Sequence, residues 1–427
     1  MRRAIQVVAL LLAGCTAQPL AAAEFLPPPE TAEAAIEALP MVRAARMRVD
    51  ESRARGDALA AGPYGLQAQF MPGVRNEHHG PMYSEWEAQL TRSLRLPDKA
   101  ALDRALGEAG TEAATLAVDD ARHAGARVLL ERWFEWLRAA HRTRLLEAQR
   151  ETLVAERATI ARRVALGDVA ALDLDRAEAT VAELGVAIAE ARRLREEARV
   201  ALVTDFPQLV LPAAPPAIPL PRHTAPTDDA LVGRIVDRSH EIGIAETIAA
   251  GQDLTARRSA ASRRPDPSIG LRLLDEGNHQ EQLVGLVLQW SFPTAANRAT
   301  AIAEGHLAAA RAVEAEAVRR DVERGARQLL AALPARISAW EAARVALASS
   351  KAALARVEAA YTLGEAGFSD LGLARRQHQG AAEHELLARL DLHESWLRID
   401  VDSHELWARH LHADDHDHVR VETLMAP

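Results

Sequence analysis

The chain has few of the residues that stabilise or identify many proteins of its length. Among 427 residues there is one cysteine, Cys15, and aromatic residues make up 4%. A single cysteine cannot form an intrachain disulfide, so the fold must be stabilised by packing. Beyond the N-terminal segment no apolar run reaches the roughly 20 residues that a membrane-spanning helix needs. Any membrane crossing must therefore use strands.

The charge pattern and the lack of catalytic motifs exclude further classes of protein. The formal net charge is −9, and no block of lysine and arginine is interleaved with aromatic residues. We therefore expect no nucleic acid partner. There is no phosphate-binding loop, no cysteine after Cys15 and no spaced set of histidines and carboxylates on a recognisable enzyme scaffold. We interpret the protein as a non-enzyme without a cofactor.

The N-terminus has the order of features of a secretory signal. Met-Arg-Arg is followed by an apolar run over residues 4–13 and then by small residues. Cleavage after Ala23 would remove a signal peptide of residues 1–23. Alternatively, the Leu-Ala-Gly-Cys sequence that ends at Cys15 has the form of a bacterial lipobox, in which residues 1–14 are removed and Cys15 carries a lipid. Both processing sites stay open, and both predict an exported protein.

The rest of the sequence is a duplication. The turn-like pair Leu166-Gly167 recurs 197 residues later as Leu363-Gly364, and an aspartate follows each glycine by six residues, at Asp173 and Asp370. A repeat of this length in a chain about twice as long indicates two related halves. We predict a first repeat over 24–206, a proline-rich connector over 207–227, a second repeat over 228–410 and a tail rich in histidine and aspartate over 411–427.

Each predicted repeat combines long helices with one strand hairpin. Alanine, leucine, arginine and glutamate dominate the long proline-free segments, and the helix expected from residue 98 to about 166 would be about 100 Å long. Apolar and polar residues alternate over hairpins at about 64–96 and 267–293, which predicts strands with one apolar face. Strands of this length and pattern are typical of transmembrane barrels. Four strands cannot close a barrel alone, so several copies must contribute.

This order of helix, hairpin, long helix, Leu-Gly turn and helix, present twice, resembles the outer membrane factor family typified by TolC. Over about residues 30–407, the layout is most similar to the heavy-metal branch, the CzcC-like proteins of cobalt-zinc-cadmium efflux. The resemblance implies a mainly α fold with transmembrane β structure, in which a duplicated long-helix coiled-coil barrel carries four strands per subunit. These strands would close as a twelve-stranded β-barrel in a homotrimer embedded in outer membrane lipid. The helices would form a tunnel across the periplasm.

The resemblance also implies roles for the two turns. Leu166, Gly167, Leu363 and Gly364 would lie at the periplasmic tip and contact a periplasmic adaptor, the membrane fusion protein, which serves an inner membrane pump of the RND type. The alternative interpretation is that both glycines are helix C-caps. Asp173 and Asp370 would form carboxylate rings that gate the aperture. Alternatively, they compensate the dipole of the helix that each begins.

Histidines raise a separate possibility at the C-terminal end. The tail has imidazoles and carboxylates suited to zinc, cobalt or nickel, and its candidate ligands are His410, His412, Asp414, Asp415, His416 and His418. No fixed four-ligand spacing is evident, so a solvated, metal-free tail is the alternative. The remaining histidines, among them His123 and His141, are scattered on helices and are expected at the surface.

Two classes of function remain. The first is a passive outer membrane duct of a tripartite efflux system, carrying heavy-metal cations or, alternatively, organic compounds or secreted proteins. The second is a periplasmic coiled-coil adaptor or scaffold without a pore. An adaptor would normally combine one helical hairpin with many short strands, whereas this chain has two strand hairpins and two helical pairs, which favours the duct.

Overall fold

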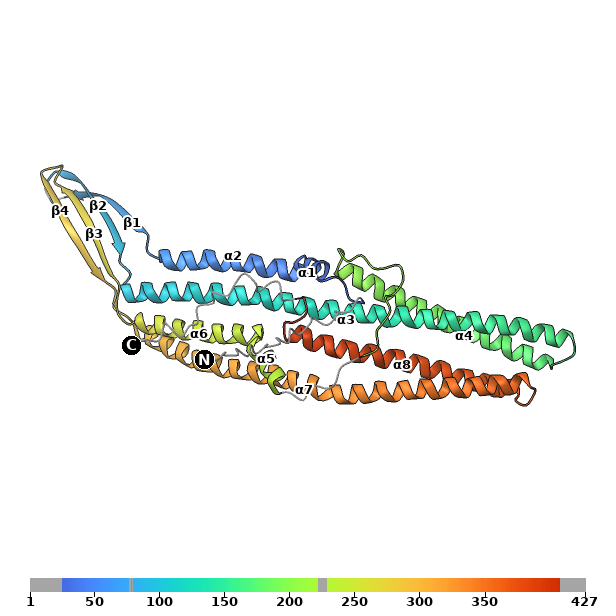
Figure 1. Cartoon of the computed structure of the whole chain (residues 1–427). Coiled ribbons are helices and arrows are strands. Elements are labelled where there is room, and N and C mark those ends of the chain that lie inside the picture. Colours follow the sequence, from blue (N-terminus) through green and yellow to red (C-terminus); the bar gives the residue numbers. More distant parts are fainter. Residues whose placement is uncertain (1–24, 77, 79, 222–228, 408–427) are drawn as a thin grey trace, which may run out of the picture. The chain divides into compact units, whose positions relative to one another are not determined.

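A computed structural model describes residues 25–76, 78, 80–221 and 229–407, and Figure 1 shows its elements. The expected signal peptide, Cys15 and the six candidate metal ligands of the tail lie outside the described residues. The described part consists of helices and one antiparallel sheet. The elements are α1 (Pro29–Glu37), α2 (Pro40–Ala61), β1 (Leu66–Asn76), β2 (Met82–Ser93), α3 (Pro97–Ala165), α4 (Ala171–Asp205), α5 (Asp229–Asp237), α6 (His240–Ala261), β3 (Pro267–Glu276), β4 (Glu281–Trp290), α7 (Ala295–Thr362) and α8 (Phe368–Asp402).

The described residues fall into two compact units. Unit 1 comprises 25–35, 129–221 and 336–394, and unit 2 comprises the remainder of the described residues. Each unit takes residues from both sequence repeats. The long helices α3 and α7 contribute to both units, with 69 and 68 residues, and the helix assignment of α7 continues through Pro334.

The helical stretch that precedes the hairpin is divided into two helices in each repeat. The first divides between α1 and α2, where Pro40 occupies the first position of α2, a position that tolerates its missing N–H. The second divides between α5 and α6, where the Ser239 hydroxyl accepts a hydrogen bond of 3.3 Å from the backbone N–H of Ile242. A proline at the first helical position and a serine N-cap thus begin the second helix at corresponding places in the two repeats.

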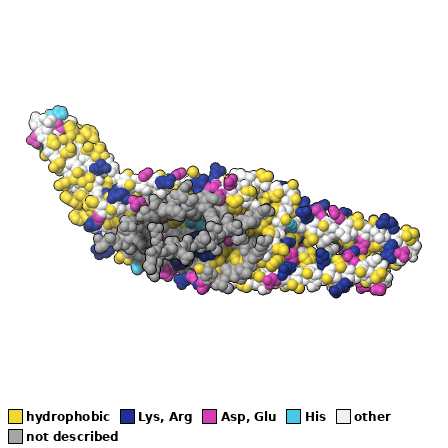
Figure 2. Space-filling view, in the orientation of Figure 1, with side chains coloured by type: hydrophobic (Ala, Val, Ile, Leu, Met, Phe, Trp, Pro, Cys, Tyr) yellow, Lys and Arg dark blue, Asp and Glu magenta, His cyan; other side chains and the backbone are white. Residues whose placement is uncertain are grey.

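The sheet has the order β1-β2-β3-β4 with antiparallel neighbours, and both predicted hairpins are confirmed. The register places most of the apolar residues of the four strands on one face, as in the row Ala68, Leu90, Leu271 and Leu286, while Leu274 and Leu283 are paired on the other face. Many side chains of this face are exposed, and Leu286 reaches 82%. Figure 2 shows hydrophobic side chains gathered over the strands. The opposite face carries polar pairs such as Arg272 with Glu87, whose Nε and Oε1 atoms lie 2.7 Å apart.

A buried ion pair secures the base of the sheet in unit 2. Lys99 at the start of α3 is 3% exposed, and its Nζ donates to Asp266 Oδ1 over 2.9 Å and to the carbonyl of Arg264 over 2.6 Å. The Tyr64 hydroxyl donates to the other oxygen of Asp266 over 2.7 Å. Although burial opposes ionisation, the hydrogen bonds from Tyr64 and Lys99 hold the pKa of Asp266 below its usual value. The two repeats are thus joined where strands meet helices.

A second buried carboxylate, Asp103, acts in the same region. Arg95 donates to Asp103 over 2.8 Å, and Arg258 from α6 donates over 2.6 Å. Arg95 also donates to the carbonyl of Ala60 at the end of α2. This carboxylate therefore links α2, α3 and α6.

Helices α2 and α3 approach closely at two glycines. A methyl group added to Gly107 would lie 2.7 Å from the Cα of Gly56, which is closer than two carbon atoms can come. The absence of both side chains is what allows this approach.

Unit 1 holds the connector between the repeats. Residues 206–221 have no helix or strand and run against α3 and α8, as their prolines predict. His141 Nε2 donates to the carbonyl of Pro216, His393 Nε2 donates to that of Pro219, both over 2.9 Å, and Arg389 donates to Ile218 over 3.1 Å. Residues 206–221 form no helix or strand, so side chains of α3 and α8 supply hydrogen bonds to these backbone carbonyls instead.

Candidate functional site

The two Leu-Gly turns adopt the same backbone motif. Gly167 and Gly364 have φ values of 73° and 77°, a region in which glycine carries no steric penalty. After α3 the N–H groups of Gly167 and Asp168 donate to the carbonyls of Val164 and Arg163, both over 2.9 Å. After α7 the corresponding bonds are 3.1 and 2.8 Å. Both turns are therefore Schellman C-caps, which bears out the capping alternative.

The leucines of the turns remain free for a further contact. Leu166 is 84% exposed and Leu363 is 74% exposed, and no atom lies within 4 Å of a Cβ built on either glycine. A cap needs the glycine but has no use for an exposed leucine before it. The adaptor contact stays a prediction, and the pair of exposed leucines is the feature that would serve it.

The two candidate gate acids occupy equivalent positions but have different partners. Each is the third residue of its helix, Asp173 in α4 and Asp370 in α8. The Asp370 carboxylate accepts the backbone N–H of Gly367 over 3.0 Å, which is half of a capping box. Asp173 pairs with Arg176 at 3.7 Å. In the single chain both acids thus make contacts within the first turn of their helices, and Asp370 remains exposed.

Side chains of the two repeats meet at the turn end of unit 1. The Arg163 guanidinium lies over the Tyr361 ring, and Arg176 donates to the hydroxyl of Ser369 over 3.2 Å. Arg375 of α8 forms ion pairs with Glu156 of α3 and with Glu358 of α7, the latter at 3.3 Å. The turns and the acids are therefore brought together by contacts that the sequence analysis did not identify. Three of them, the contacts of Arg163, of Arg176 and of Arg375 with Glu156, join the two repeats over about 200 positions, and neither periodicity nor spacing reveals such pairs.

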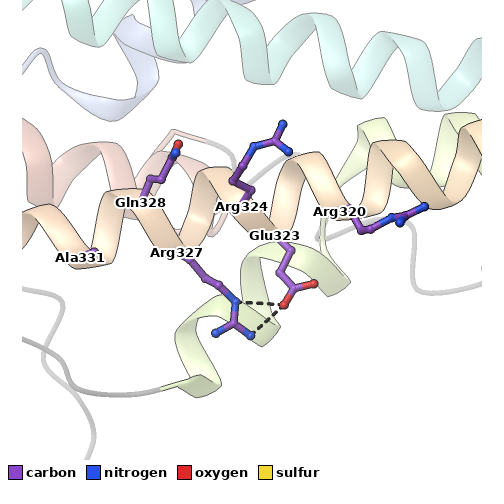
Figure 3. A pocket seen from close by; sticks show the side chains of 6 residues that line it. All are labelled: Arg320, Glu323, Arg324, Arg327, Gln328 and Ala331. Carbon is purple, nitrogen blue, oxygen red and sulfur yellow. Dashed lines mark hydrogen bonds and ion pairs between the residues drawn. The ribbon is translucent and has the colours of Figure 1, made fainter.

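No group of three or more histidine, cysteine or acidic side chains in the described part of the chain could hold a metal ion. A shallow depression on α7 is lined by Arg320, Arg324, Gln328 and Ala331 together with the ion pair of Glu323 and Arg327 (Figure 3). These charged side chains pair along their own helix, Arg327 also lies 3.9 Å from Asp229 at the start of α5, and all are largely exposed, so the depression is an ordinary solvated helix face.

One expectation about the histidines is wrong. His123 was expected at the surface but is 6% exposed, and His141 is half-buried. His123 lies beside the half-buried His240 of α6 and beside Asp402 and His404, two buried residues at the end of α8 and after it. The pattern of its own helix does not reveal these neighbours, because they come from distant parts of the chain.

No helix in the described part of the chain is long and apolar enough to span a membrane. No family model and no curated protein matches the sequence.

The fold, in contrast, is shared with solved structures. The OprN outer-membrane channel aligns with a TM-score of 0.74 at 19% identity, over 89% of this chain and 90% of that one. The open state of the Neisseria gonorrhoeae MtrE outer membrane channel aligns with a TM-score of 0.72 at 19% identity, over 89% of each chain. CusC, whose structures describe folding and transmembrane channel formation, gives 0.72 at 15% identity, over 88% of this chain and 91% of that one. The chain therefore has the fold of these outer membrane channels.

Proposed function

We propose that this chain is one subunit of a homotrimeric outer membrane duct in a tripartite efflux system of the TolC-like family. It conducts its substrate passively, and the inner membrane pump supplies the energy. The observation that carries the proposal is the four-stranded sheet with one exposed apolar face. An exposed apolar face of this extent marks a surface that is covered by lipid or protein. A duct wall in outer membrane lipid requires such an apolar surface, whereas a periplasmic scaffold does not.

The edges of the sheet support assembly from several copies. Within the chain β1 and β4 each pair on one side only, and their free edges leave backbone groups that lipid cannot satisfy. Pairing β4 of one copy with β1 of the next removes both edges. Three copies of four strands give a closed barrel of twelve.

The unequal burial of the two long helices supports the same assembly. In unit 2, α3 buries Lys99, Asp103, Val118, Ala121, His123 and Ala126, whereas α7 buries Ala315, Ala326 and Leu333. The two helices occupy equivalent places in the repeats, so their surroundings would match if a neighbouring copy covered α7. Exposed apolar residues of α7, such as Ile302 and Val313, would then be buried.

At the turn end, we assign the exposed leucines at 166 and 363 to the periplasmic adaptor and the carboxylates of Asp173 and Asp370 to the gate. In a trimer each acid occurs three times around the axis, and six carboxylates in one aperture would favour cations and exclude anions. Heavy-metal cations are the proposed substrate, on the basis of the family resemblance. Organic compounds and secreted proteins are the alternative substrates.

Extraction from membranes tests the duct directly. The protein should fractionate with the outer membrane and run on gels as an oligomer that heating converts to a monomer. In planar bilayers it should form channels. Recovery as a detergent-independent soluble protein would contradict the duct and favour the scaffold. Sensitivity of a deletion strain to zinc, cobalt, cadmium and copper, compared with a dye panel, then distinguishes the substrate classes.

A further inference from the structure

The apolar face of the sheet carries one charged side chain near each end. Among the residues of β1–β4 on this face, only Arg92 of β2 and Asp275 of β3 are charged. Asp275 is 3% exposed, lies 2.8 Å from His279 Nδ1 and accepts a hydrogen bond of 3.2 Å from Gln282. The charge of Asp275 is therefore balanced within its own hairpin.

Arg92 has no such partner. Its side chain is exposed, and within the described part of the chain it forms no ion pair and no hydrogen bond. Leu66 of β1 and Ile269 of β3 lie directly opposite it, and Leu288 of β4 continues the same row. The guanidinium is thus surrounded by apolar side chains, and a charge in such surroundings needs an anion from outside the sheet.

The acids next to this end of the sheet already have cations of their own. The pairs are Asp266 with Lys99, Asp103 with Arg95 and Arg258, and Asp98 with Arg264. In the proposed barrel the strands that meet a neighbouring copy are β1 and β4, and neither has a charged residue on the apolar face. We therefore expect the anion for Arg92 to come from the surroundings of the barrel.

Aromatic residues place Arg92 near a boundary of the apolar face. Trp290 lies one row nearer the helices than Arg92, and Phe292 follows it; their side chains are 51% and 80% exposed. Toward the opposite end, the ring centroids of Phe70 and Trp86 lie 6.0 Å apart. Aromatic girdles of this kind mark the two headgroup levels around an outer membrane barrel. Arg92 therefore lies close to the headgroup level at the helix end.

This depth suits an arginine. Near the interface a lipid-facing arginine costs far less than at the bilayer midplane, and its long apolar stem lets the guanidinium extend toward the headgroups. There the planar guanidinium can donate two parallel hydrogen bonds to one phosphate. The amine of a zwitterionic headgroup competes for that phosphate, whereas an anionic headgroup has no cation of its own. The position therefore favours an anionic phospholipid.

We propose that Arg92 binds the phosphate of an anionic phospholipid, such as phosphatidylglycerol, at the end of the sheet next to the helices. The inference rests on the proposed duct, because it requires the apolar face to lie in the membrane. The second repeat has Leu288 in the same row, so each chain contributes one site and a trimer has three. Bound lipid helps to fix the depth of the barrel in the membrane.

Brominated lipids test the site through Trp290. The full chain is reconstituted in vesicles of equal parts dioleoyl phosphatidylglycerol and dioleoyl phosphatidylcholine, with bromine on the acyl chains of one lipid or of the other. Trp86→Phe leaves Trp290 as the only tryptophan of the four strands, and bromine quenches its fluorescence at short range. The ratio of the two quenching efficiencies reports which lipid lies beside it. We expect about threefold greater occupancy by phosphatidylglycerol.

Four variants assign this preference to the guanidinium. Arg92→Gln loses no contact within the described chain and should make the occupancies of the two lipids equal. Arg92→Lys keeps the charge without the two parallel hydrogen bonds and should give an intermediate preference. Leu288→Arg added to Arg92→Gln returns a cation to the same row and should restore the preference. Arg48→Gln, at an exposed position of α2 without an ion pair among the described residues, is the matched control and should behave as the original chain.

Two results would overturn the proposal and leave the duct intact. They are equal quenching by the two lipids in the original chain, and a preference for phosphatidylglycerol that is unchanged in Arg92→Gln. Absence of quenching by either lipid would contradict the duct itself, because Trp290 would then lie outside the bilayer, and the lipid site would be wrong with it.

Discussion

The guanidinium of Arg163 lies 5.7 Å from the ring centroid of Tyr361 and joins the end of α3 to the end of α7. The same guanidinium donates to Asp168 over 2.7 Å within the first turn. The two turns therefore share one arginine. The tyrosine occurs only in the second repeat, because Val164 occupies the corresponding position in the first.

Replacing Tyr361 should loosen both turns together. Tyr361→Ala removes the ring over which the Arg163 guanidinium lies, so it should increase hydrogen exchange at residues 163–168 and 361–366 about two- to fivefold. Tyr361→Phe keeps the ring and should remain close to the original protein. An increase confined to the second turn would show that Arg163 does not couple them.

Substitution of the turn glycines should act through the backbone alone. Gly364 has positive φ and open space around its Cβ position, so Gly364→Ala should cost about 1–2 kcal/mol. Gly380, inside α8, is equally open, and Gly380→Ala should stabilise by about 0.5–1 kcal/mol. Thermal unfolding followed by circular dichroism at one scan rate compares them. Equal shifts in the two variants would contradict a backbone cause.

The gate acids can be separated from their capping role. Asp370→Asn keeps an oxygen for the N–H of Gly367 but removes the charge. If the carboxylates gate the aperture, Asp173→Asn with Asp370→Asn should raise single-channel conductance and weaken cation selectivity in planar bilayers. An effect seen with alanine but not with asparagine would assign these residues to capping only.

The connector should loosen in acid. Burial lowers the pKa of His141, Arg389 and Arg144 lower it further, and the bond to Pro216 opposes them. Because the folded pKa is below the unfolded value of about 6.5, the contribution to stability is complete above that pH and is lost as pH falls toward the folded pKa. Exchange in residues 209–221 should therefore increase at pH 5.5 and less so in His141→Gln. The exposed His384→Gln is the control.

The base of the sheet should depend strongly on Lys99. Lys99→Met leaves Asp266 buried without its cation, and breaking such a pair costs about 3–5 kcal/mol. The exposed pair of Arg193 and Glu190 is a suitable comparison, since an ion pair in contact with solvent contributes little and Arg193→Ala should leave the stability nearly unchanged. Detergent-solubilised protein should show a lower thermal midpoint for the first variant only. If the thermal midpoint of Lys99→Met falls no further than that of Arg193→Ala, the ion pair does not anchor the sheet.

Local patterns in the sequence predict the elements well and their partners poorly. Alternation over 64–96 and 267–293 predicts both hairpins, and the faces follow from it because side chains alternate along a strand. The break between α5 and α6 at Ser239 is not visible in the pattern, because a single N-cap residue can divide a helix although the apolar periodicity continues. The partners of Lys99 and His123 come from residues far away in the sequence, so their burial depends on the tertiary arrangement alone.

The close approach of Gly56 and Gly107 has a consequence at larger scale. A side chain at either position would push two neighbouring backbones apart. In a ring of helices every spacing adds to the circumference, and three copies would repeat each change three times. In the proposed duct, two residues that contribute no side chain would thus help to set the width of the bore.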